Sequence, residues 1–339
     1  MRAPPPVVAP EVTAPVKSGT CPGVSVVIPA FNYAHYLPMA LDSVLAQSYF
    51  PLDVIVVDDD STDGTAAVVK AYPTVRYVHQ AHAGLSAARN TGIGAARFDL
   101  IAFLDADDQW KSPFLFTLVT RLLALPPMIG VIACRQELMD ERGLDIPQVR
   151  WHPDADTDRV LRMEDMLIKT RFGASGIVAR RACFDTCGRF DTTLTSSEDR
   201  DMWLRIARRW SIFYLSQGFT RVRRHASNMS RQPDRMRHNM NRVLIRAFRE
   251  RFLPVWPWSR WLRIWSYRHV QSAWMYHDAT RQARAIGELC LSVLVWPWRH
   301  DARDLDLPPL FRLRAFRHFF RDWIRQAYSN RASGGPQWH

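Results

Sequence analysis

Residues 101–110, IAFLDADDQW, place three aspartates directly after an apolar run. Residues 100–104 have the length and composition of a buried strand. Carboxylates this close repel one another, so the cluster requires a positive partner. In open α/β sheets, ligands bind beyond the carboxyl ends of the strands. The stretch therefore predicts a strand that ends at a ligand site.

The same scheme recurs along the first half of the chain. Apolar strand patterns, expected at 24–29, within 53–61, and at 75–80, 100–104 and 130–140, alternate with helical patterns at 36–47, 63–72, 84–96 and 113–125. This alternation predicts an α/β fold, Rossmann-like, with a mostly parallel central sheet and helices on both faces. Because Asn32, Asp58–Ser61 and Asp105–Asp108 follow three of the strands, we expect them at one edge of the sheet.

Charge and tryptophan divide the 339-residue chain into two parts. Residues 1–228 carry 25 Lys+Arg and 25 Asp+Glu, whereas residues 229–339 carry 20 Arg, 8 Asp+Glu and nine of the 13 Trp. We therefore expect a flexible Pro-rich lead (1–22), a catalytic domain (23–230) and an Arg/Trp-rich helical region (231–339). The five scattered cysteines form no CxxC pair, and no apolar run reaches the ~18 residues of a membrane span. We expect a cytoplasmic location.

Asp105 and Asp107 form a DxD pattern that suits a divalent cation. Mg²⁺ prefers carboxylate oxygens and leaves room for substrate phosphates, whose charge it neutralises. Neither GxGxxG directly after a strand nor GxxxxGK[ST] is present, so phosphate binding must come from elsewhere. The alternative is that the acids favour the N-terminus of the next helix. Asp108 is expected to cap the following turn.

Three further segments carry candidate side chains, each with a plainer interpretation beside it. DDDSTDGT (58–65) either offers Asp58 and Asp59 to a ligand or forms a turn and helix cap. SSEDRDMWLRIA (196–207) predicts a helix whose first turn holds Asp199, as a general base or as a capping residue. His225 follows a basic run in RVRRHASNMS (221–230), and such a lone histidine is more often structural than a ligand.

Taken together, these motifs resemble the family 2 glycosyltransferases. VVIPAFN, IVVDDDSTDGT, GLSAARNTGIGAA, FLDADDQW, SSEDRDMWLRIA and RRHASNMS occur in the order and spacing of that family. The resemblance covers residues 24 to about 230 and implies an inverting enzyme of the GT-A fold. The remaining residues resemble, loosely, the helical extensions of bacterial members.

The resemblance also implies roles for individual residues. The wall around the nucleotide base is matched by Pro29, Ala30, Phe31 and Asn32. Asp59 matches the aspartate that contacts the base, and Arg89 matches the residue next to that aspartate in the nucleotide pocket. Asp105 matches the acid that faces the ribose, and Asp107 the metal ligand. Asp199 matches the base that activates the acceptor, and His225 a position near the metal or diphosphate. Asp60 departs from the family, which usually has glycine there.

The implied reaction moves a sugar from a nucleotide-diphosphate donor, expected to be UDP-linked, to a hydroxyl of a glycan or lipid-linked acceptor in cell-surface polysaccharide biosynthesis. Mg²⁺ or Mn²⁺, with His225, Arg221, Arg223 or Arg224, would neutralise the leaving diphosphate, while Asp199 takes the acceptor proton in a single displacement. A retaining route would need a second carboxylate beside the sugar.

Two different classes of function stay open beside this one. The first is a non-catalytic scaffold with a transferase-like nucleotide-binding domain. Loss of catalysis should have been accompanied by substitutions in the DxD, the Glu-Asp pair or the nucleotide turn. All three motifs are intact. The second is a nucleotidyltransferase on a similar sheet. It would need a Gly-rich or Lys-bearing phosphate loop near the first strand, and this loop is missing.

Residues 231–339 predict amphipathic helices broken at Pro254, Pro257 and Pro297, with another helix at 311–327. Their tryptophans and arginines suit packing on the catalytic domain, contact with an anionic membrane, or nucleic-acid binding. No nucleic-acid motif is present, so no nucleic-acid partner is expected. We expect helical packing together with peripheral contact at the inner face of the cell membrane.

Overall fold

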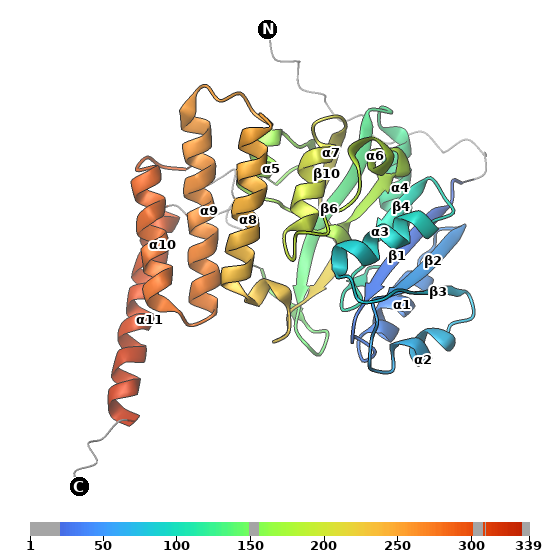
Figure 1. Ribbon diagram of the computed structural model, residues 1–339, viewed down its shortest axis with the longest axis horizontal. Coiled ribbons are helices and arrows are strands. Elements are labelled where there is room, and N and C mark those ends of the chain that lie inside the picture. The colour runs from blue at the N-terminus through green and yellow to red at the C-terminus, as the bar shows by residue number, and fades with distance from the viewer. Residues whose placement is uncertain (1–20, 149–155, 301–307, 309, 334–339) are drawn as a thin grey trace.

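A computed structural model describes residues 21–148, 156–300, 308 and 310–333 (Figure 1). Almost all of the predicted Pro-rich lead, 1–22, lies outside these described residues. The N-terminal half of the sheet is parallel: β1 (Val24–Ala30) pairs with β2 (Leu52–Asp58) and β4 (Leu100–Phe103), and β2 pairs with β3 (Val75–His79). Every residue of β1 is buried, as expected for a strand covered on both faces.

The other half of the sheet is mixed. β9 (Ile177–Arg180) runs antiparallel between β4 and β6 (Ile129–Met139), while β10 (Ser211–Arg223) is parallel to β6. The full order is β3-β2-β1-β4-β9-β6-β10-β5, with short antiparallel additions at β5 (Gln109–Trp110), β7 (Asp145–Ile146) and β8 (Arg159–Val160). The sequence did not indicate β9, which is four residues long, or β10, whose register is interrupted by bulges. The predicted α/β class is confirmed.

Helices cover both faces of the sheet, at α1 (Leu37–Leu45), α2 (Thr65–Lys70), α3 (Leu85–Ala95), α4 (Phe114–Ala124), α5 (Met163–Ile168), α6 (Arg181–Cys187) and α7 (Glu198–Ile206). α1 and α4 bury Leu41 and Leu118 in the core of one face. α3 packs on the other face, and it needs Gly92 to do so. A Cβ at Gly92 would lie 2.1 Å from Val27 Cγ1, so only glycine allows this close approach.

The C-terminal region folds into α8 (Pro233–Arg249), α9 (Trp258–Asp278), α10 (Gln282–Val295) and α11 (Phe311–Ser333), which lie side by side beyond α7 (Figure 1). Leu244 of α8 and Ile264 of α9 belong to the same apolar core as Val27 and Trp203. The predicted helical extension is therefore present, and α8 and α9 pack on the α/β half of the chain. In the described part of the chain, no helix combines the length and apolar character needed to cross a bilayer.

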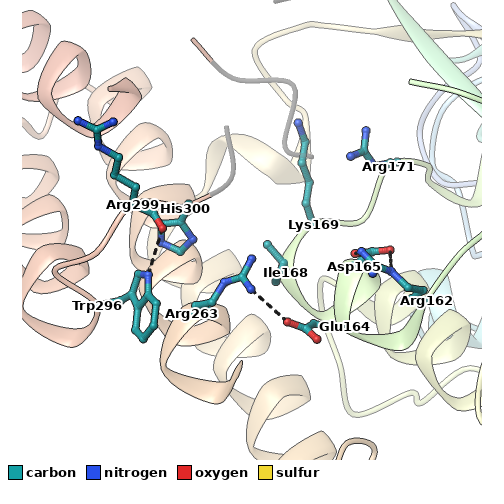
Figure 2. Close-up of a pocket in the computed structure, with 10 residues that line it drawn as sticks. All are labelled: Arg162, Glu164, Asp165, Ile168, Lys169, Arg171, Arg263, Trp296, Arg299 and His300. Carbon is teal, nitrogen blue, oxygen red and sulfur yellow. Dashed lines mark hydrogen bonds and ion pairs between the residues drawn. The ribbon is translucent and has the colours of Figure 1, made fainter. Parts of the chain in front are cut away.

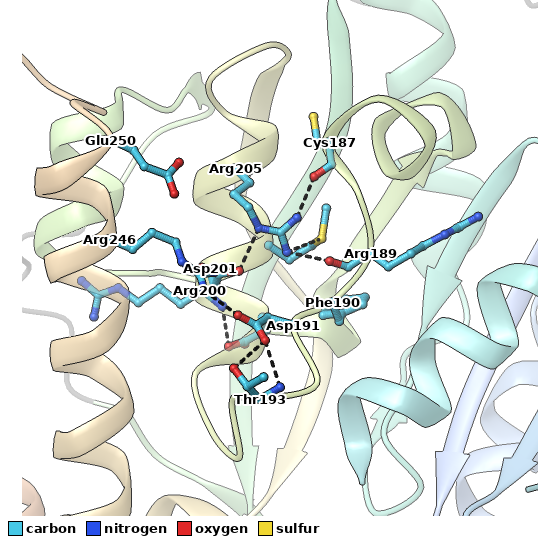
Figure 3. Close-up of polar contacts among 12 residues, drawn as sticks. Cys187, Arg189, Phe190, Asp191, Thr193, Arg200, Asp201, Arg205, Arg246 and Glu250 are labelled. Atoms are coloured by element: carbon cyan, nitrogen blue, oxygen red, sulfur yellow. Dashed lines mark hydrogen bonds and ion pairs between the residues drawn. The ribbon is translucent and has the colours of Figure 1, made fainter. Parts of the chain in front are cut away.

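A partly buried ionic network fastens α7 to α8 (Figure 3). Arg246 of α8 donates to Asp191 Oδ2 at 2.6 Å and to Asp201 Oδ1 at 2.7 Å, and Arg205 donates to Asp201 Oδ2 at 2.8 Å. Burial alone would raise the pKa of Asp191, but hydrogen bonds from Arg246 and Thr193 lower it to about 2. The network fixes the helix that carries Asp199.

Candidate active site

A cavity of about 1260 Å³ lies at the carboxyl ends of β1, β2 and β4, closed on its far side by α8 and α9. The predicted site residues that line it are Pro29, Ala30, Phe31, Asp59, Arg89, Asp105, Asp107 and Asp199. Asn32 and His225 are not part of the lining. The strand-end acids therefore share one cavity with the first turn of α7.

Asn32 joins two loops instead of facing the cavity. Its backbone N–H donates to Ser61 Oγ at 3.0 Å, and its Oδ1 accepts from the Thr62 N–H at 2.8 Å. Asn32 adopts a left-handed conformation (φ 58°), which asparagine tolerates better than most residues. Phe31, the preceding residue, lines the cavity, and its ring centroid lies 4.4 Å from that of His82. Phe31 and His82 thus place two tilted rings, 36° apart, on the cavity wall.

Asp59 is buried beneath the loop that precedes α3. Its Oδ1 accepts from Gln80 Nε2 at 2.6 Å and from the Ala83 N–H at 2.9 Å, while Oδ2 accepts from the Gly84 N–H at 2.8 Å. The carboxylate therefore positions this loop as well as facing the cavity.

The neighbouring Asp60 points elsewhere. It has φ 68°, a left-handed conformation that explains why glycine suits this position. Its carboxylate contacts His79 at 3.2 Å and does not line the cavity. The additional negative charge that departs from the family pattern is therefore outside the lining.

Arg89 is fully buried and bridges two acids from distant parts of the chain. Its Nη2 donates to Asp105 Oδ1 at 2.7 Å and its Nη1 to Glu198 Oε1 at 2.6 Å. Burial by itself would lower the pKa of Arg89, but the charges of Asp105 and Glu198 raise it above its usual value. The guanidinium thus links the end of β4 to the start of α7. Glu198 was not among the side chains predicted to act here.

The three aspartates after β4 have different surroundings. The Asp105 side chain is 32% exposed in the cavity, and that of Asp107 is 12% exposed. Asp108 is buried, where its Oδ2 accepts from Ser175 Oγ at 2.6 Å and its Oδ1 from the Arg223 N–H at 3.0 Å. The predicted turn cap is therefore wrong for Asp108: its carboxylate ties β10 to the strand end. Burial, and then the charges of Asp107 and Asp105, raise its pKa well above the usual value.

His225 lies directly against Asp107, with Nε2 2.9 Å from Oδ2. Asn228 Nδ2 is 3.4 Å from the same oxygen, and Ser227 Oγ is 2.8 Å from His225 Nδ1. Carboxylate oxygens with an adjacent imidazole fit a small divalent cation. Asp107, the predicted metal ligand, is thus in contact with His225, the other side chain predicted near the metal. No local sequence pattern indicated Asn228.

Of the three arginines expected near the diphosphate, Arg221 and Arg223 do not line the cavity. Arg221 donates to Asp145 and to Gln109, whereas Arg223 is buried and donates to the carbonyls of Asp107 and Glu141. Of the three, only Arg224 lines the cavity.

Among the described residues, several buried polar atoms of the cavity lining have no hydrogen-bond partner, and two of them lie next to the strand-end acids. Ser86, which the sequence did not indicate, lines the cavity beside Arg89. Within the described residues, Ser86 Oγ and Arg89 Nε are buried without a hydrogen-bond partner. Buried polar groups are nearly always satisfied, so these two atoms are exceptions within the described part of the chain.

Asp199 stands in the first turn of α7, after Ser197 in a left-handed conformation (φ 59°). It is half-buried and lines the cavity. Burial, followed by the charge of Glu198, raises the pKa of Asp199 to about 7, although Arg89 opposes the shift. A carboxylate with a pKa near neutrality can both accept and release a proton in that range. Asp199 therefore has the environment of a general base.

Beyond Asp199 the cavity wall changes character. α8 and α9 contribute methionine and aromatic side chains, namely Met236, Met240, Tyr267, Trp274 and Met275. Thr170 Oγ1 and Gln271 Oε1 also lie on this side, buried and without a hydrogen-bond partner among the described residues. The sequence did not place α8 and α9 at the site, because their apolar periodicity is that of any packed helix.

A second, smaller cavity of about 400 Å³ lies between α5 and the C-terminal helices (Figure 2). It is rich in cations, but Arg162 pairs with Asp165 at 2.8 Å and Arg263 with Glu164 at 3.6 Å. None of the predicted site residues lines it. The strand-end acids line the larger cavity and not the smaller one. We therefore interpret the smaller cavity as a polar gap between α5 and the C-terminal helices.

The N-terminal half of the chain is similar in sequence to known glycosyltransferases. Residues 25–183 match the sequence model of the family described as glycosyl transferase family 2. An uncharacterized glycosyltransferase of Rickettsia bellii is 29% identical over 214 residues, which cover 62% of this chain and 31% of that protein. The chain thus spans about a third of the length of this relative and of further ones from Nostoc sp. and Rickettsia felis.

Two solved structures share the fold. The mannosyltransferase PcManGT from Pyrobaculum calidifontis, in complex with GDP-Man and Mn²⁺, superposes with a TM-score of 0.58 at 20% identity, covering 86% of this chain and 79% of that one. S. aureus TarS 1-349, in complex with UDP-GlcNAc, gives a TM-score of 0.55 at 15% identity, covering 88% and 92%. Both superpositions cover more of the chain than residues 24–230, so the fold likeness includes part of the helical extension.

Proposed function

We propose that the chain is an inverting, metal-dependent glycosyltransferase, because residues 25–183 match the sequence model of glycosyl transferase family 2. Its donor would be a nucleotide-diphosphate sugar, UDP-linked in our prediction, and its acceptor a hydroxyl of a glycan or glycolipid used for cell-surface polysaccharide. The observation that carries the proposal is the shared cavity, in which Asp59, Asp105, Asp107 and Asp199 converge from strand-end loops and one helix.

In the proposed reaction, Phe31 and Asp59 hold the nucleotide base, and the Arg89–Asp105 pair orients the ribose side of the donor. Asp199 accepts the proton of the acceptor hydroxyl as that oxygen forms its bond to the anomeric carbon. The bond from this carbon to the diphosphate oxygen breaks in the same step, so the configuration inverts. One base suffices, and no side chain needs to form a covalent intermediate.

A divalent cation fits the carboxylates at the end of β4. Asp107, supported by His225 and Asn228, would hold it, with Asp105 facing the same space. When bound, the cation neutralises the charge that develops on the diphosphate. PcManGT, which shares the fold, was solved with Mn²⁺ and GDP-Man, and this supports the expectation without identifying the sugar used here.

The decisive experiment is a thermal-shift panel of UDP- and GDP-sugars with and without Mn²⁺, followed by a test of nucleotide release. We expect one donor to raise the melting temperature in the presence of Mn²⁺, and chelation to abolish the effect. Binding of a nucleotide sugar without hydrolysis or transfer to any acceptor would favour a scaffold that retains only the nucleotide-binding domain.

We also propose that the extension contacts an anionic membrane from the cytoplasmic side, as a peripheral protein. The outer face of α11 supports this. Large apolar side chains recur there every three or four residues and are 39–49% exposed, at Leu313, Phe316, Phe320, Trp323 and Ile324. Arg314, Arg317, Arg321 and Arg325 follow along the same helix. An apolar stripe flanked by arginines suits the headgroup region of a bilayer.

Flotation with vesicles of phosphatidylcholine, with or without phosphatidylglycerol, tests this contact. Phe316→Ser with Phe320→Ser should reduce binding to the anionic vesicles, whereas Phe116→Ser, an exposed phenylalanine on α4, should not. Equal flotation of all variants would refute the contact through α11. Dimers seen by light scattering, lost in the double variant, would assign the stripe to a second copy of the chain instead.

A further inference from the structure

A group of side chains outside the reaction cavity has the composition of a transition-metal site. His277 lies at the end of α9, and His318 and Asp322 lie on α11. Each offers one ligand atom, and the three atoms lie within 4.8 Å of one another. Because His318 and Asp322 are four residues apart on one helix, their side chains share a face, and this face is turned toward His277.

The spacing within this group is wrong for hydrogen bonds and close to that around a metal ion. Asp322 Oδ2 lies 3.7 Å from His277 Nε2 and 3.6 Å from His318 Nε2. Hydrogen bonds of this kind measure about 2.7–3.2 Å. Bonds of about 2.0–2.1 Å to a tetrahedral ion place neighbouring ligand atoms about 3.3 Å apart. A small inward movement of each side chain would therefore complete three coordination bonds.

Neighbouring groups hold the ring of His277 in the orientation that a ligand needs. Gln282 Oε1 lies 2.8 Å from Nδ1, so this nitrogen donates and Nε2 keeps its lone pair, directed at Asp322. The ring also stacks on Phe319, with 4.3 Å between centroids. An acceptor behind the second ring nitrogen is the usual support of a metal-binding histidine.

We propose that His277, His318 and Asp322 bind one late transition-metal dication of the Zn²⁺ class, with water as the fourth ligand, and that this ion fastens α11 to α9. Two imidazoles and one carboxylate favour such ions over Mg²⁺ or Ca²⁺, which prefer oxygen ligands. This site is separate from the proposed catalytic cation and does not depend on glycosyl transfer. It is nevertheless connected to the cavity, because the Trp274 ring lies 5.8 Å from His277 and 6.0 Å from His318.

Arg321 provides an internal test of the site. Its Nη2 donates to His318 Nδ1 at 2.9 Å, which places the ring proton on Nε2, the nitrogen that must bind the ion. Metal binding requires the proton to move to Nδ1 and Arg321 to leave, and its side chain is 58% exposed and able to do so. Arg321→Gln removes the competing cation and offers an amide oxygen to Nδ1–H. This variant should bind the ion more tightly than the wild type.

The experiment is calorimetric titration of the untagged, chelator-treated full chain with ZnCl₂, with Co²⁺ absorption as a report on tetrahedral geometry. His318→Ala and Asp322→Asn should each bind one equivalent of zinc fewer, or bind it at least about 10- to 100-fold more weakly. Loss of a group that only supports a ligand already lowers metal affinity by about 10- to 100-fold. His238→Ala, an exposed histidine of α8, should retain it. Alanine is a good helix former and asparagine has the shape of aspartate, so both variants should fold.

Equal zinc stoichiometry and affinity in the wild type, His318→Ala and Asp322→Asn would overturn the proposed site. Hydrogen exchange separates the fastening from the binding: Zn²⁺ should slow exchange of α11 amides in the wild type and leave it unchanged in His318→Ala. Zinc binding without this protection would overturn the link between α11 and α9.

Discussion

The guanidinium of Arg89 donates to Asp105 Oδ1 at 2.7 Å, and through its other arm it holds Glu198 beside the proposed base. Replacing Arg89 by methionine leaves Glu198 buried and unpaired, so we expect a loss of about 3–5 kcal/mol in the free energy of unfolding. Because Arg89 opposes the upward shift of the Asp199 pKa, its loss should also move the acidic limb of the pH–rate profile to higher pH. Urea unfolding and the pH profile measure the two effects, and Arg89→Lys should be intermediate in both.

Asp199→Asn should lower kcat by about 10²- to 10⁴-fold, the usual contribution of a general base, while donor binding by thermal shift stays unchanged. In the wild type, the base is ionised above its pKa, so kcat/KM should rise with pH up to about 7 and then level off. Asp185→Asn, an exposed aspartate on α6, serves as the matched control. Near-normal turnover by Asp199→Asn would remove the residue from this role.

Arg246→Met should destabilise the chain by about 1 kcal/mol at neutral pH, because Arg246 and Thr193 together lower the pKa of Asp191 from 3.8 to about 2 and the variant loses only the part due to Arg246. A depressed carboxyl pKa contributes stability above the unfolded value of 3.8, and this contribution is lost as the pH falls through about 2. Unfolding curves of the two proteins should therefore converge between these pH values. A difference that stays constant down to pH 2 would rule out Asp191 as the origin.

Asp60→Gly tests the departure from the family pattern. The left-handed conformation at φ 68° strains aspartate and not glycine, but glycine loses more backbone entropy on folding. The two effects nearly cancel, so the free energy of unfolding should change by less than about 1 kcal/mol. Since the Asp60 carboxylate does not line the cavity, KM for the donor should stay the same. A marked fall in donor KM would show that its charge does reach the nucleotide.

Residues that sit directly at strand ends could be predicted from the sequence. Asp59, Asp105 and Asp107 follow apolar runs, and parallel strands bring their carboxyl ends to one edge by geometry alone. Asp108 could not be separated from its neighbours in this way, because its burial depends on Ser175 and β10, which are distant along the chain. Glu198 and Asn228 escaped prediction for the same reason: their importance comes from Arg89 and Asp107, not from a local pattern.

The composition of the Arg/Trp-rich region points to packing and to a membrane, but not to the reaction. The composition of the chain changes abruptly near residue 230. This change predicts a boundary between two domains, and the boundary remains a prediction. The described structure runs α8 and α9 along the cavity instead of away from it. The composition of a segment depends on how many of its residues face solvent or lipid. It does not indicate which of its side chains line a cavity.

The lining of the cavity has separate origins along the chain: residues up to Met229 supply the strand-end acids and Asp199, and α8 and α9 supply the opposite wall. Recombination near the end of β10 would therefore exchange one wall and keep the other. We expect chimaeras joined there to keep the donor of the first parent and to adopt the acceptor of the second. If the proposed function holds, exchange of the C-terminal helices alone would change the acceptor and keep the sugar.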